Sequence, residues 1–370
     1  MSILLYVGAL LLTIILLSHV SFTYNSEQAF RGVFLERGKL RIQKELWIII
    51  IGFIPLWILI AFRDIKVGTD TSGTYLKIFN FATLNRSWEI EVRRWSEIGY
   101  FMINRIIGHF TDNYNYVIII TGTITWFLYY RYIVKNSVNP RFSILLFFLS
   151  FYYFHSFNGI RQLLANAILL QGFKYIYSRK FKNFLIIILV ASLIHTMSVL
   201  MLPFYFLSKI ATNRKTSIVL VLVSKVVLSA MMYNLSGFIS NTKYYNLLHD
   251  NRSYVGGYWW SDIVISSAIF FVFFFIFDEK KNTNTYNNLN GWLITVSLII
   301  AVNSNSIPIP NRFLWYANIN LPVYIPQMLK SIEQKKNRAI CTSLILCFYL
   351  FYFVQQWLAG TDHVQLYAFM

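Results

Sequence analysis

Long apolar runs recur along this sequence from one end to the other, and they restrict its fold more than any other feature. Each run holds roughly 16–22 residues, the length that an α-helix needs to cross the hydrocarbon core of a bilayer. Only 13% of the residues are charged, whereas 56% are hydrophobic and the mean hydropathy is +0.52. A soluble chain of 370 residues needs far more polar surface. The runs therefore predict an all-α, polytopic integral membrane protein that forms a single membrane domain over residues 1–370.

The formal net charge of +18 would fit a nucleic-acid-binding protein if the basic residues were clustered. They are instead dispersed in short loops between the apolar runs, as is typical of the cytoplasmic loops of membrane proteins. The loop after the first run carries Arg31, Arg37, Lys39, Arg41 and Lys44. That loop is therefore predicted to be cytoplasmic and the N-terminus to lie outside, and no nucleic-acid partner is expected.

The basic loops and the apolar runs together predict about twelve transmembrane or half-membrane helices, with both chain ends outside. The expected membrane segments are Ile3–Val20, Leu46–Phe62, Asn115–Val134, Phe142–Phe157, Gly159–Tyr177, Phe184–Leu207, Ser217–Leu235, Ile263–Phe277, Trp292–Ser304, Phe313–Leu329 and Ala339–Leu358.

The segment Phe184–Leu207 could form one helix or two. A single helix would leave Lys209 and Arg214 outside, against the charge rule. Two short helices with a break near His195 and Thr196 keep them inside. We prefer the break, because discontinuous helices are tolerated where they line a cavity.

Two longer polar stretches, 63–114 and 236–261, are expected on the outer face. In the first stretch, apolar residues recur at helical spacing: Trp88, Val92, Trp95, Ile98, Met102 and Ile106. This pattern predicts an amphipathic helix that lies in the membrane interface. The alternative is a tilted spanning segment, which would move Arg131, Lys135 and Arg141 to the outer face.

A short motif, Asn158-Gly159-Ile160-Arg161-Gln162, places a guanidinium where two of the apolar runs meet. An arginine at that place costs free energy unless an anion or a water-filled cavity receives it. The predicted topology puts Arg161 on the outer face, where most acidic residues and histidines also fall. We therefore expect anion binding and acid–base chemistry on the outer side.

Several short motifs follow one another in a characteristic order. They are Arg63 to Thr71 with Val67-Gly68-Thr69-Asp70 and the later Tyr75, Glu97-Ile98-Gly99-Tyr100, Ile160-Arg161-Gln162 with Ala165, Ala191 to Ser198 around His195, and Asn311-Arg312-Phe313. Their order and spacing over nearly the whole chain resemble the EpsG family of bacterial exopolysaccharide and capsule polymerases, which are related to O-antigen polymerases. The chain departs from the family pattern at Ile194 and Val199, where phenylalanine and alanine are usual.

The resemblance implies a metal-independent glycosyltransferase of the helical GT-C type, in the bacterial cytoplasmic membrane and without a cofactor. Its substrates would be undecaprenyl-pyrophosphate-linked oligosaccharide repeat units at the periplasmic or extracellular face. The growing chain would pass from its carrier onto the non-reducing end of a new lipid-linked unit. Such a protein could also contact a flippase and a chain-length regulator.

A transfer of this kind needs a cationic group that holds the pyrophosphate. Arg161, Arg312 and Arg63 are the candidates, because a guanidinium binds phosphate oxygens bidentately and stays charged. The alternative for each arginine is a structural one, in which it snorkels to the interface or pairs with Asp64 or Asp70.

The reaction also needs a base for the acceptor hydroxyl. His195 is the first candidate, with the carboxylates of Asp70 and Glu97 as alternatives. His195 could instead hydrogen-bond a neighbouring helix, and Asp70 could form an Asx turn. The secondary candidates are His155, Gln162 and Lys225. No metal site is predicted, because the sequence has no His-x-x-x-His or Glu-x-x-His pattern.

Other functions share some of these features. A flippase or transporter of lipid-linked sugars would also have a basic cavity, but it should show internal repeats, and we find none. A polysaccharide ligase uses the same leaving group, so the residues alone do not separate it from a polymerase. A membrane acyltransferase would favour a His-Asp signature, and a non-catalytic scaffold would not explain the outward acid–base groups.

Overall fold

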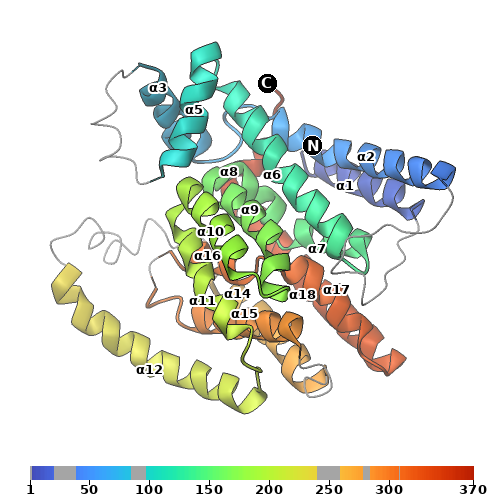
Figure 1. The fold of residues 1–370 in the computed structure, drawn as a ribbon, viewed down its shortest axis with the longest axis vertical. Helices are drawn as coiled ribbons and strands as arrows, with labels where there is room; N and C mark the ends of the chain where they lie inside the picture. Colours follow the sequence, from blue (N-terminus) through green and yellow to red (C-terminus); the bar gives the residue numbers. More distant parts are fainter. Residues whose placement is uncertain (1, 21–38, 85–96, 240–258, 278–283, 308) are drawn as a thin grey trace. The chain divides into compact units, whose positions relative to one another are not determined.

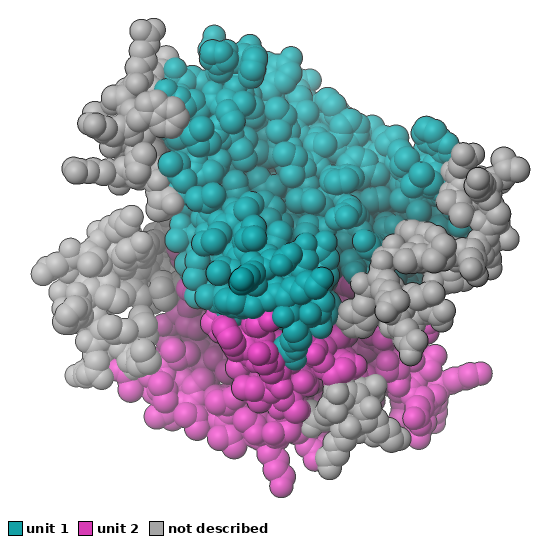
Figure 2. All heavy atoms as spheres, viewed as in Figure 1, with its two compact units in different colours: residues 1–202, 362–370 teal, residues 203–361 magenta. Residues whose placement is uncertain are grey.

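The computed structural model describes residues 2–20, 39–84, 97–239, 259–277, 284–307 and 309–370. Every element in these ranges is a helix, apart from one isolated antiparallel bridge between Arg63 and Phe369. The all-α prediction is thereby confirmed for the described residues. The chain divides into two compact units, each described on its own: unit 1 is Met1–Leu202 with Asp362–Met370, and unit 2 is Pro203–Thr361 (Figure 2).

Unit 1 is a set of helices in which neighbours in sequence mostly pack on one another (Figure 1). They are α1 (Ser2–Ser18), α2 (Lys39–Ala61), the π-helical turn η1 (Thr71–Tyr75), α3 (Leu76–Leu84), α5 (Ile98–Phe110), α6 (Asn115–Asn136), α7 (Pro140–Leu149), α8 (Tyr152–Asn158), α9 (Ile160–Tyr177), α10 (Phe181–Ile194) and the 3₁₀ turn η2 (Thr196–Met201). Helix α1 packs on α2, α2 on α6, α6 on α9, and α9 on α10.

The apolar run 142–157 was predicted as one continuous helix, and this prediction is wrong. Helix α7 ends at Leu149 and α8 begins at Tyr152, because Phe151 has a φ of 64°, which no right-handed helix contains. The Phe151 side chain is completely buried, and its ring centroid lies 4.7 Å from that of Phe154. Apolar burial therefore holds the break in a segment whose hydrophobicity gives no sign of one.

The predicted break in segment 184–207 is confirmed. Helix α10 ends at Ile194, and His195 has an extended backbone (φ −149°, ψ 112°) before η2 begins at Thr196. The short helix α11 (Leu202–Leu207) follows. The His195 side chain consequently projects from a helix end.

Unit 1 also includes most of the final 3₁₀ turn, η4 (Thr361–Leu366). Unit 2 contains α11, apart from Leu202, and a further set of helices. They are α12 (Arg214–Ile239), α14 (Trp259–Phe271), the π-helical turn η3 (Val272–Ile276), α15 (Thr285–Val302), α16 (Pro310–Ala317), α17 (Leu321–Lys330) and α18 (Lys335–Leu358). The prediction of one continuous helix over 313–329 is wrong, because α16 and α17 are separated by Asn318–Asn320. In this break, the Asn320 amide donates to Asn290 Oδ1 of α15 at 2.8 Å.

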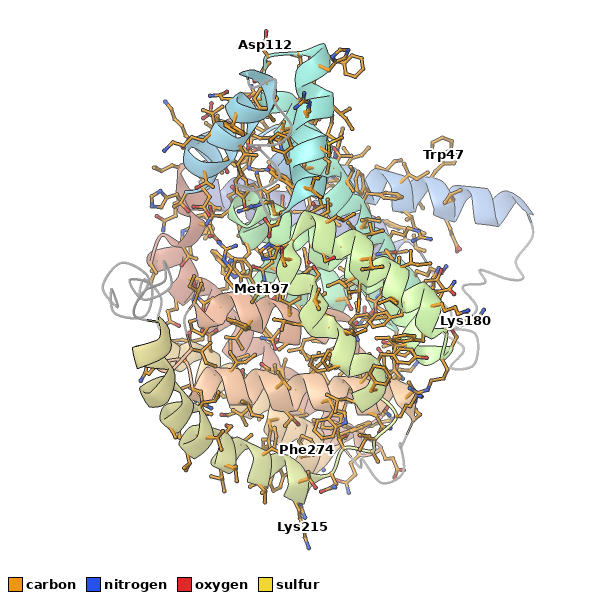
Figure 3. All side chains as sticks on the ribbon, turned by 60° about the vertical axis from the view of Figure 1, so that its left-hand side comes forward. Trp47, Asp112, Lys180, Met197, Lys215 and Phe274 are labelled. Carbon is orange, nitrogen blue, oxygen red and sulfur yellow. The ribbon has the colours of Figure 1, made fainter. Side chains whose placement is uncertain are left out.

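Among the described helices, α6 and α18 are long and apolar enough to cross a membrane by length and composition. Shorter apolar helices include α1, α7 and α10. Many large apolar side chains point outward, such as Trp47 of α2, which is 64% exposed (Figure 3). These features agree with the predicted membrane character. The number of about twelve transmembrane or half-membrane helices stays a prediction.

The two outer stretches are only partly described. Residues 63–114 include η1, α3 and α5, while Trp88, Val92 and Trp95 of the predicted amphipathic helix lie outside the described residues. In α5, Ile106 is 56% exposed, and Tyr100 lies on the buried side. Most of 236–261 lies outside the described residues, because the description of α12 stops at Ile239 and that of α14 starts at Trp259.

Gly68 allows the loop after α2 to approach the end of α8. Its φ is +106°, and an added Cβ would lie 2.6 Å from the carbonyl oxygen of Phe157. We predict that Gly68→Ala lowers the free energy of unfolding of the protein by about 2 kcal/mol, because both the backbone and the contact become strained. The thermal unfolding midpoint of the purified protein measures this change.

The matched control is Gly8→Ala in α1, where an added Cβ meets no atom within 4 Å. Alanine favours a helix over glycine, so its midpoint should equal or slightly exceed that of the wild type. Equal midpoints for Gly68→Ala and the wild type would contradict the close approach at Phe157.

Candidate functional site

The carboxylate of Glu97 joins two other predicted site residues in unit 1. Its Oε2 accepts a hydrogen bond from Nη1 of Arg161, and its Oε1 is paired with Nδ1 of His195. The backbone N–H of Thr196 also donates to Oε1 at 3.2 Å. The side chain of Glu97 is 8% exposed, against 24% for Arg161 and 15% for His195. Three of the predicted candidates thus form one cluster that is partly open to solvent.

Local backbone geometry brings these side chains together. Glu97 directly precedes α5, and Arg161 lies in the first turn of α9. Gly99 in α5 packs on the last turn of α10, where an added Cβ would lie 2.9 Å from the carbonyl oxygen of Leu193. The absence of a side chain at Gly99 therefore allows Glu97 to reach His195, just past the end of α10.

Two aromatic rings flank the guanidinium of Arg161. Its Cζ lies 5.4 Å from the ring centroid of Tyr75 and 5.9 Å from that of Tyr100. Arg161 Nε is buried, and no residue of the described part of the chain accepts a hydrogen bond from it. The arginine is thus oriented by Glu97 and by cation–π contacts, while its side chain stays partly exposed.

The charges around Glu97 determine its protonation. Burial by itself would raise the pKa of Glu97, but the hydrogen bond with His195 and the positive charge of Arg161 outweigh burial and hold this pKa below its ordinary value of 4.5. Glu97 is therefore a carboxylate at neutral pH and a weak base. When His195 donates its Nδ1 proton to Glu97, the ring lone pair is on Nε2, which is the arrangement of an oriented general base.

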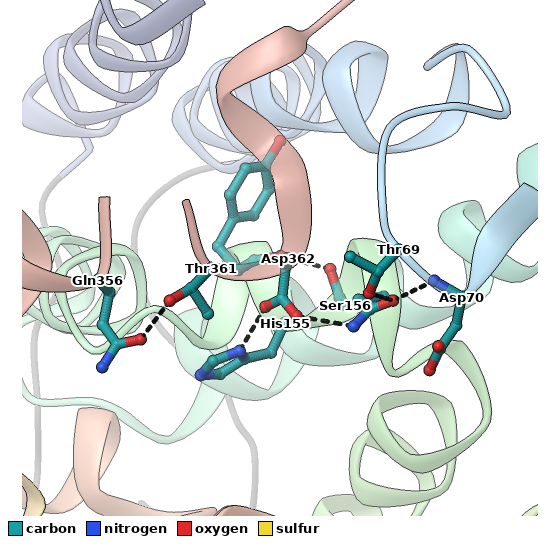
Figure 4. Close-up of polar contacts among 9 residues, drawn as sticks. Thr69, Asp70, His155, Ser156, Gln356, Thr361 and Asp362 are labelled. Atoms are coloured by element: carbon teal, nitrogen blue, oxygen red, sulfur yellow. Dashed lines mark hydrogen bonds and ion pairs between the residues drawn. The ribbon is translucent and has the colours of Figure 1, made fainter. Parts of the chain in front are cut away.

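A second polar cluster lies at the junction of α8 and α9 (Figure 4). The side-chain oxygen of Asn158 accepts hydrogen bonds from Thr69 Oγ1 at 2.8 Å and from the backbone N–H of Asp70 at 2.7 Å. Its amide nitrogen donates to Asp362 Oδ1 at 2.8 Å, and Asp362 Oδ2 lies 2.7 Å from His155 Nδ1. Asp70 and His155 are thereby joined through Asn158 and Asp362.

Sequence reasoning missed Asp362, although one signal was available. The signal is that Asp362 is the only acidic residue after Glu333 in the sequence. No motif includes it, and its partners lie more than half the chain away. Only the packing of the C-terminal segment on unit 1 reveals its contacts.

Arg63 lies in a different environment from Arg161. Its side chain is almost completely buried, and it donates to the backbone carbonyls of Ile60 at 2.5 Å, Val67 at 3.4 Å and Phe157 at 3.0 Å. Thr71 Oγ1 donates to the same Phe157 carbonyl at 3.0 Å. Arg63 thus ties the loop after α2 to the end of α8.

The remaining predicted residues are placed as follows. Gln162 is completely buried in α9. Arg312 and Lys225 belong to unit 2, so only their contacts within that unit are given. Arg312 Cζ lies 5.2 Å from the ring centroid of Trp315, and Lys225 Nζ donates to the carbonyl of Val302 at the end of α15 at 3.0 Å.

The lowered pKa of Glu97 predicts a pH dependence of stability. A carboxyl group whose pKa is lower in the folded state stabilises that state above its unfolded pKa of about 4.5, and this contribution is lost as the pH falls through the folded pKa. The wild type should therefore lose more stability than Glu97→Gln between pH 6 and roughly pH 3. Unfolding midpoints across this range measure the difference, and parallel curves would show that Glu97 is not held by Arg161 and His195.

Comparison with known protein families gives a match over most of the chain. The sequence profile of the EpsG family matches residues 46–369. No match was found among curated proteins or among solved structures. Because the profile spans most of the chain, the protein belongs to the EpsG family, and this membership implies a role in exopolysaccharide biosynthesis.

Proposed function

We propose that this protein is an integral membrane polysaccharide polymerase that joins undecaprenyl-pyrophosphate-linked oligosaccharide repeat units. The observation that carries this proposal is the Glu97 carboxylate that holds both Arg161 and His195. An arginine can stabilise a pyrophosphate leaving group, and a histidine–carboxylate pair can accept the proton of an acceptor hydroxyl. Membership of the EpsG family supports the substrate class.

The proposed reaction is a single glycosyl transfer. The acceptor hydroxyl of a new lipid-linked unit attacks the anomeric carbon of the growing chain, and the bond from that carbon to the pyrophosphate oxygen breaks. The hydroxyl proton passes to Nε2 of His195. The electron pair of the broken bond leaves with the lipid pyrophosphate, whose added negative charge is stabilised by Arg161.

Glu97 has an orienting role in this proposal. Its lowered pKa makes it a poor proton acceptor, but its carboxylate fixes the ring of His195 and stabilises the imidazolium that forms. It also keeps the guanidinium of Arg161 beside the histidine. Asp70 stays the alternative candidate for the general base, and its backbone N–H donates to Asn158 Oδ1 at 2.7 Å.

The other arginines have separate roles in the proposal. Arg63 supports the site by fixing the Phe157 carbonyl, since its donors are directed to backbone oxygens. Arg312 of unit 2 stays a candidate for binding pyrophosphate, and Lys225 is proposed as a structural contact at the end of α15. Gln162 would act by packing next to Arg161 in α9, and His155 by its contact with Asp362.

The membrane topology is part of the proposal. About twelve crossing or half-crossing helices in a GT-C-like bundle would place Arg161 and His195 at the outer face of the bacterial cytoplasmic membrane. The apolar helices α6 and α18 and the outward apolar side chains support a bilayer environment. A flippase would deliver lipid-linked units to this face, and a chain-length regulator could contact the polymerase there.

Reconstitution with lipid-linked repeat units tests the proposed activity. The purified protein is placed in liposomes with undecaprenyl-pyrophosphate-linked oligosaccharide, and the product length is read on a gel. A ladder of polymers is expected. A unit-length product with intact carrier would contradict the proposal, translocation without bond formation would indicate a flippase, and transfer of one unit to a lipid acceptor would indicate a ligase.

Substitution of Arg161 in the same assay tests its contact with the pyrophosphate. We predict a fall in rate of about 100-fold for Arg161→Ala and about tenfold for Arg161→Lys, because lysine keeps the charge but loses bidentate binding. The matched control is Arg141→Ala, since Arg141 is an exposed arginine at the start of α7. Wild-type rates in both Arg161 variants would exclude the proposed role.

A further inference from the structure

The C-terminal segment of the chain supplies a buried carboxylate to unit 1. The side chain of Asp362 is 7% exposed, and its two oxygens have different partners on α8. Oδ1 accepts from Asn158 Nδ2, and Oδ2 is paired with His155 Nδ1 (Figure 4). Since a carboxylate only accepts hydrogen bonds, His155 must donate from Nδ1, and this fixes its tautomer and ring orientation.

The backbone around Asp362 adopts a conformation that residues other than glycine rarely have. Asp362 has φ 60° and ψ 10°, and His363 has φ 50° and ψ 33°. Such residues cost conformational free energy and persist only where their surroundings hold them in place. The rest of the segment is held by backbone pairing, with the Asp64 N–H donating to Ala368 O at 2.8 Å and the Met370 N–H to Phe62 O at 3.1 Å.

The contacts of Asp362 lead directly to the first turn of α9. Asn158 is held on one side by Asp362 and on the other by Thr69 and the backbone of Asp70. Gly159 follows as the N-cap residue of α9, and Arg161 lies in the first turn. Any movement of Asn158 therefore changes where the Arg161 side chain begins, and with it the contact between Arg161 and Glu97.

We propose that Asp362 is a positioning residue for Arg161, acting through Asn158 and His155. Asp362 orients the side-chain amide of Asn158, which in turn fixes the Thr69–Asp70 turn against the start of α9. It does not contact the substrate or the reacting atoms. This inference rests on the proposed polymerase activity, because its consequence is a change in the rate of transfer.

An exchange of amide and carboxylate between positions 158 and 362 tests the proposal. Asn158→Asp alone brings two carboxylates to hydrogen-bond distance, so they repel each other. Asp362→Asn alone turns an amide nitrogen either toward Asn158 Nδ2, which is also a donor, or toward His155 Nδ1, which must then give up its proton and change tautomer. In the double variant N158D/D362N, the carboxylate at position 158 accepts from Thr69, from the Asp70 backbone and from the new amide, while the amide oxygen at position 362 accepts from His155. Every hydrogen bond of the network is restored with the groups exchanged.

Two measurements follow the exchange. The first is the polymerisation rate per folded molecule, well below the unfolding midpoint of each variant. We expect a fall of about 100-fold for Asn158→Asp and about tenfold for Asp362→Asn, and a return to within about threefold of the wild type for the double variant. The second is hydrogen exchange of the Asp70 backbone amide, which needs no substrate. Exchange should be faster in each single variant and slow again in the double variant.

The control is Asp64→Asn. Within the described part of the chain, the Asp64 side chain accepts a local hydrogen bond from the Lys66 N–H, and the side-chain oxygen of asparagine can keep it. This variant should match the wild type in both measurements. Wild-type rates in the single variants, or no recovery in the double variant, would overturn the positioning role. If the wild type makes no polymer, the proposed function fails, and the exchange rates of the Asp70 amide still decide whether Asp362 holds the turn.

Discussion

The candidate site depends on one buried carboxylate, that of Glu97. A carboxylate with so little exposure is stable only if donors replace its lost hydration, since an unpaired buried charge costs several kcal/mol. Arg161, His195 and the Thr196 backbone supply these donors. The same contacts join the start of α9 to the end of α10. The negative charge of Glu97, which needs hydrogen-bond donors, therefore also brings Arg161 and His195 together.

Two backbone features make this contact possible. Gly99 lets α5 pack directly on the Leu193 carbonyl, and the end of α10 at Ile194 frees His195 from the helix. At the end of α8, the Phe157 carbonyl accepts from both Arg63 and Thr71, which fixes the junction between α8 and α9. The start of α9, which carries Arg161, is thereby held by the end of α8, and the Arg161 side chain is held by Glu97. Such fixed geometry is what a transfer reaction needs, because misplacement by about 1 Å costs rate.

Much of this arrangement could be predicted from the sequence, and the remainder could not for physical reasons. The break at His195 followed from the basic residues after it, which a single helix would have placed outside. Glu97, Arg161 and His195 were each predicted as candidates, but their pairing was not, because it depends on how closely helices pack at Gly99. The break at Phe151 has no signal in hydrophobicity, since a buried phenylalanine stabilises it. Arg63 was predicted as a pyrophosphate contact from its charge and position, whereas its partners in the structure are backbone carbonyls.

The most direct test of the Glu97 contacts is nitrogen NMR of the protein labelled in its six histidines. The His195 signals are assigned by their loss in His195→Gln. The shared carboxylate predicts a proton on Nδ1 of His195 that exchanges slowly with water, and predicts that this signal disappears in Glu97→Ala. A His195 Nδ1 proton that is absent from the wild type, or unchanged in Glu97→Ala, would contradict the central claim that Glu97 orients the histidine.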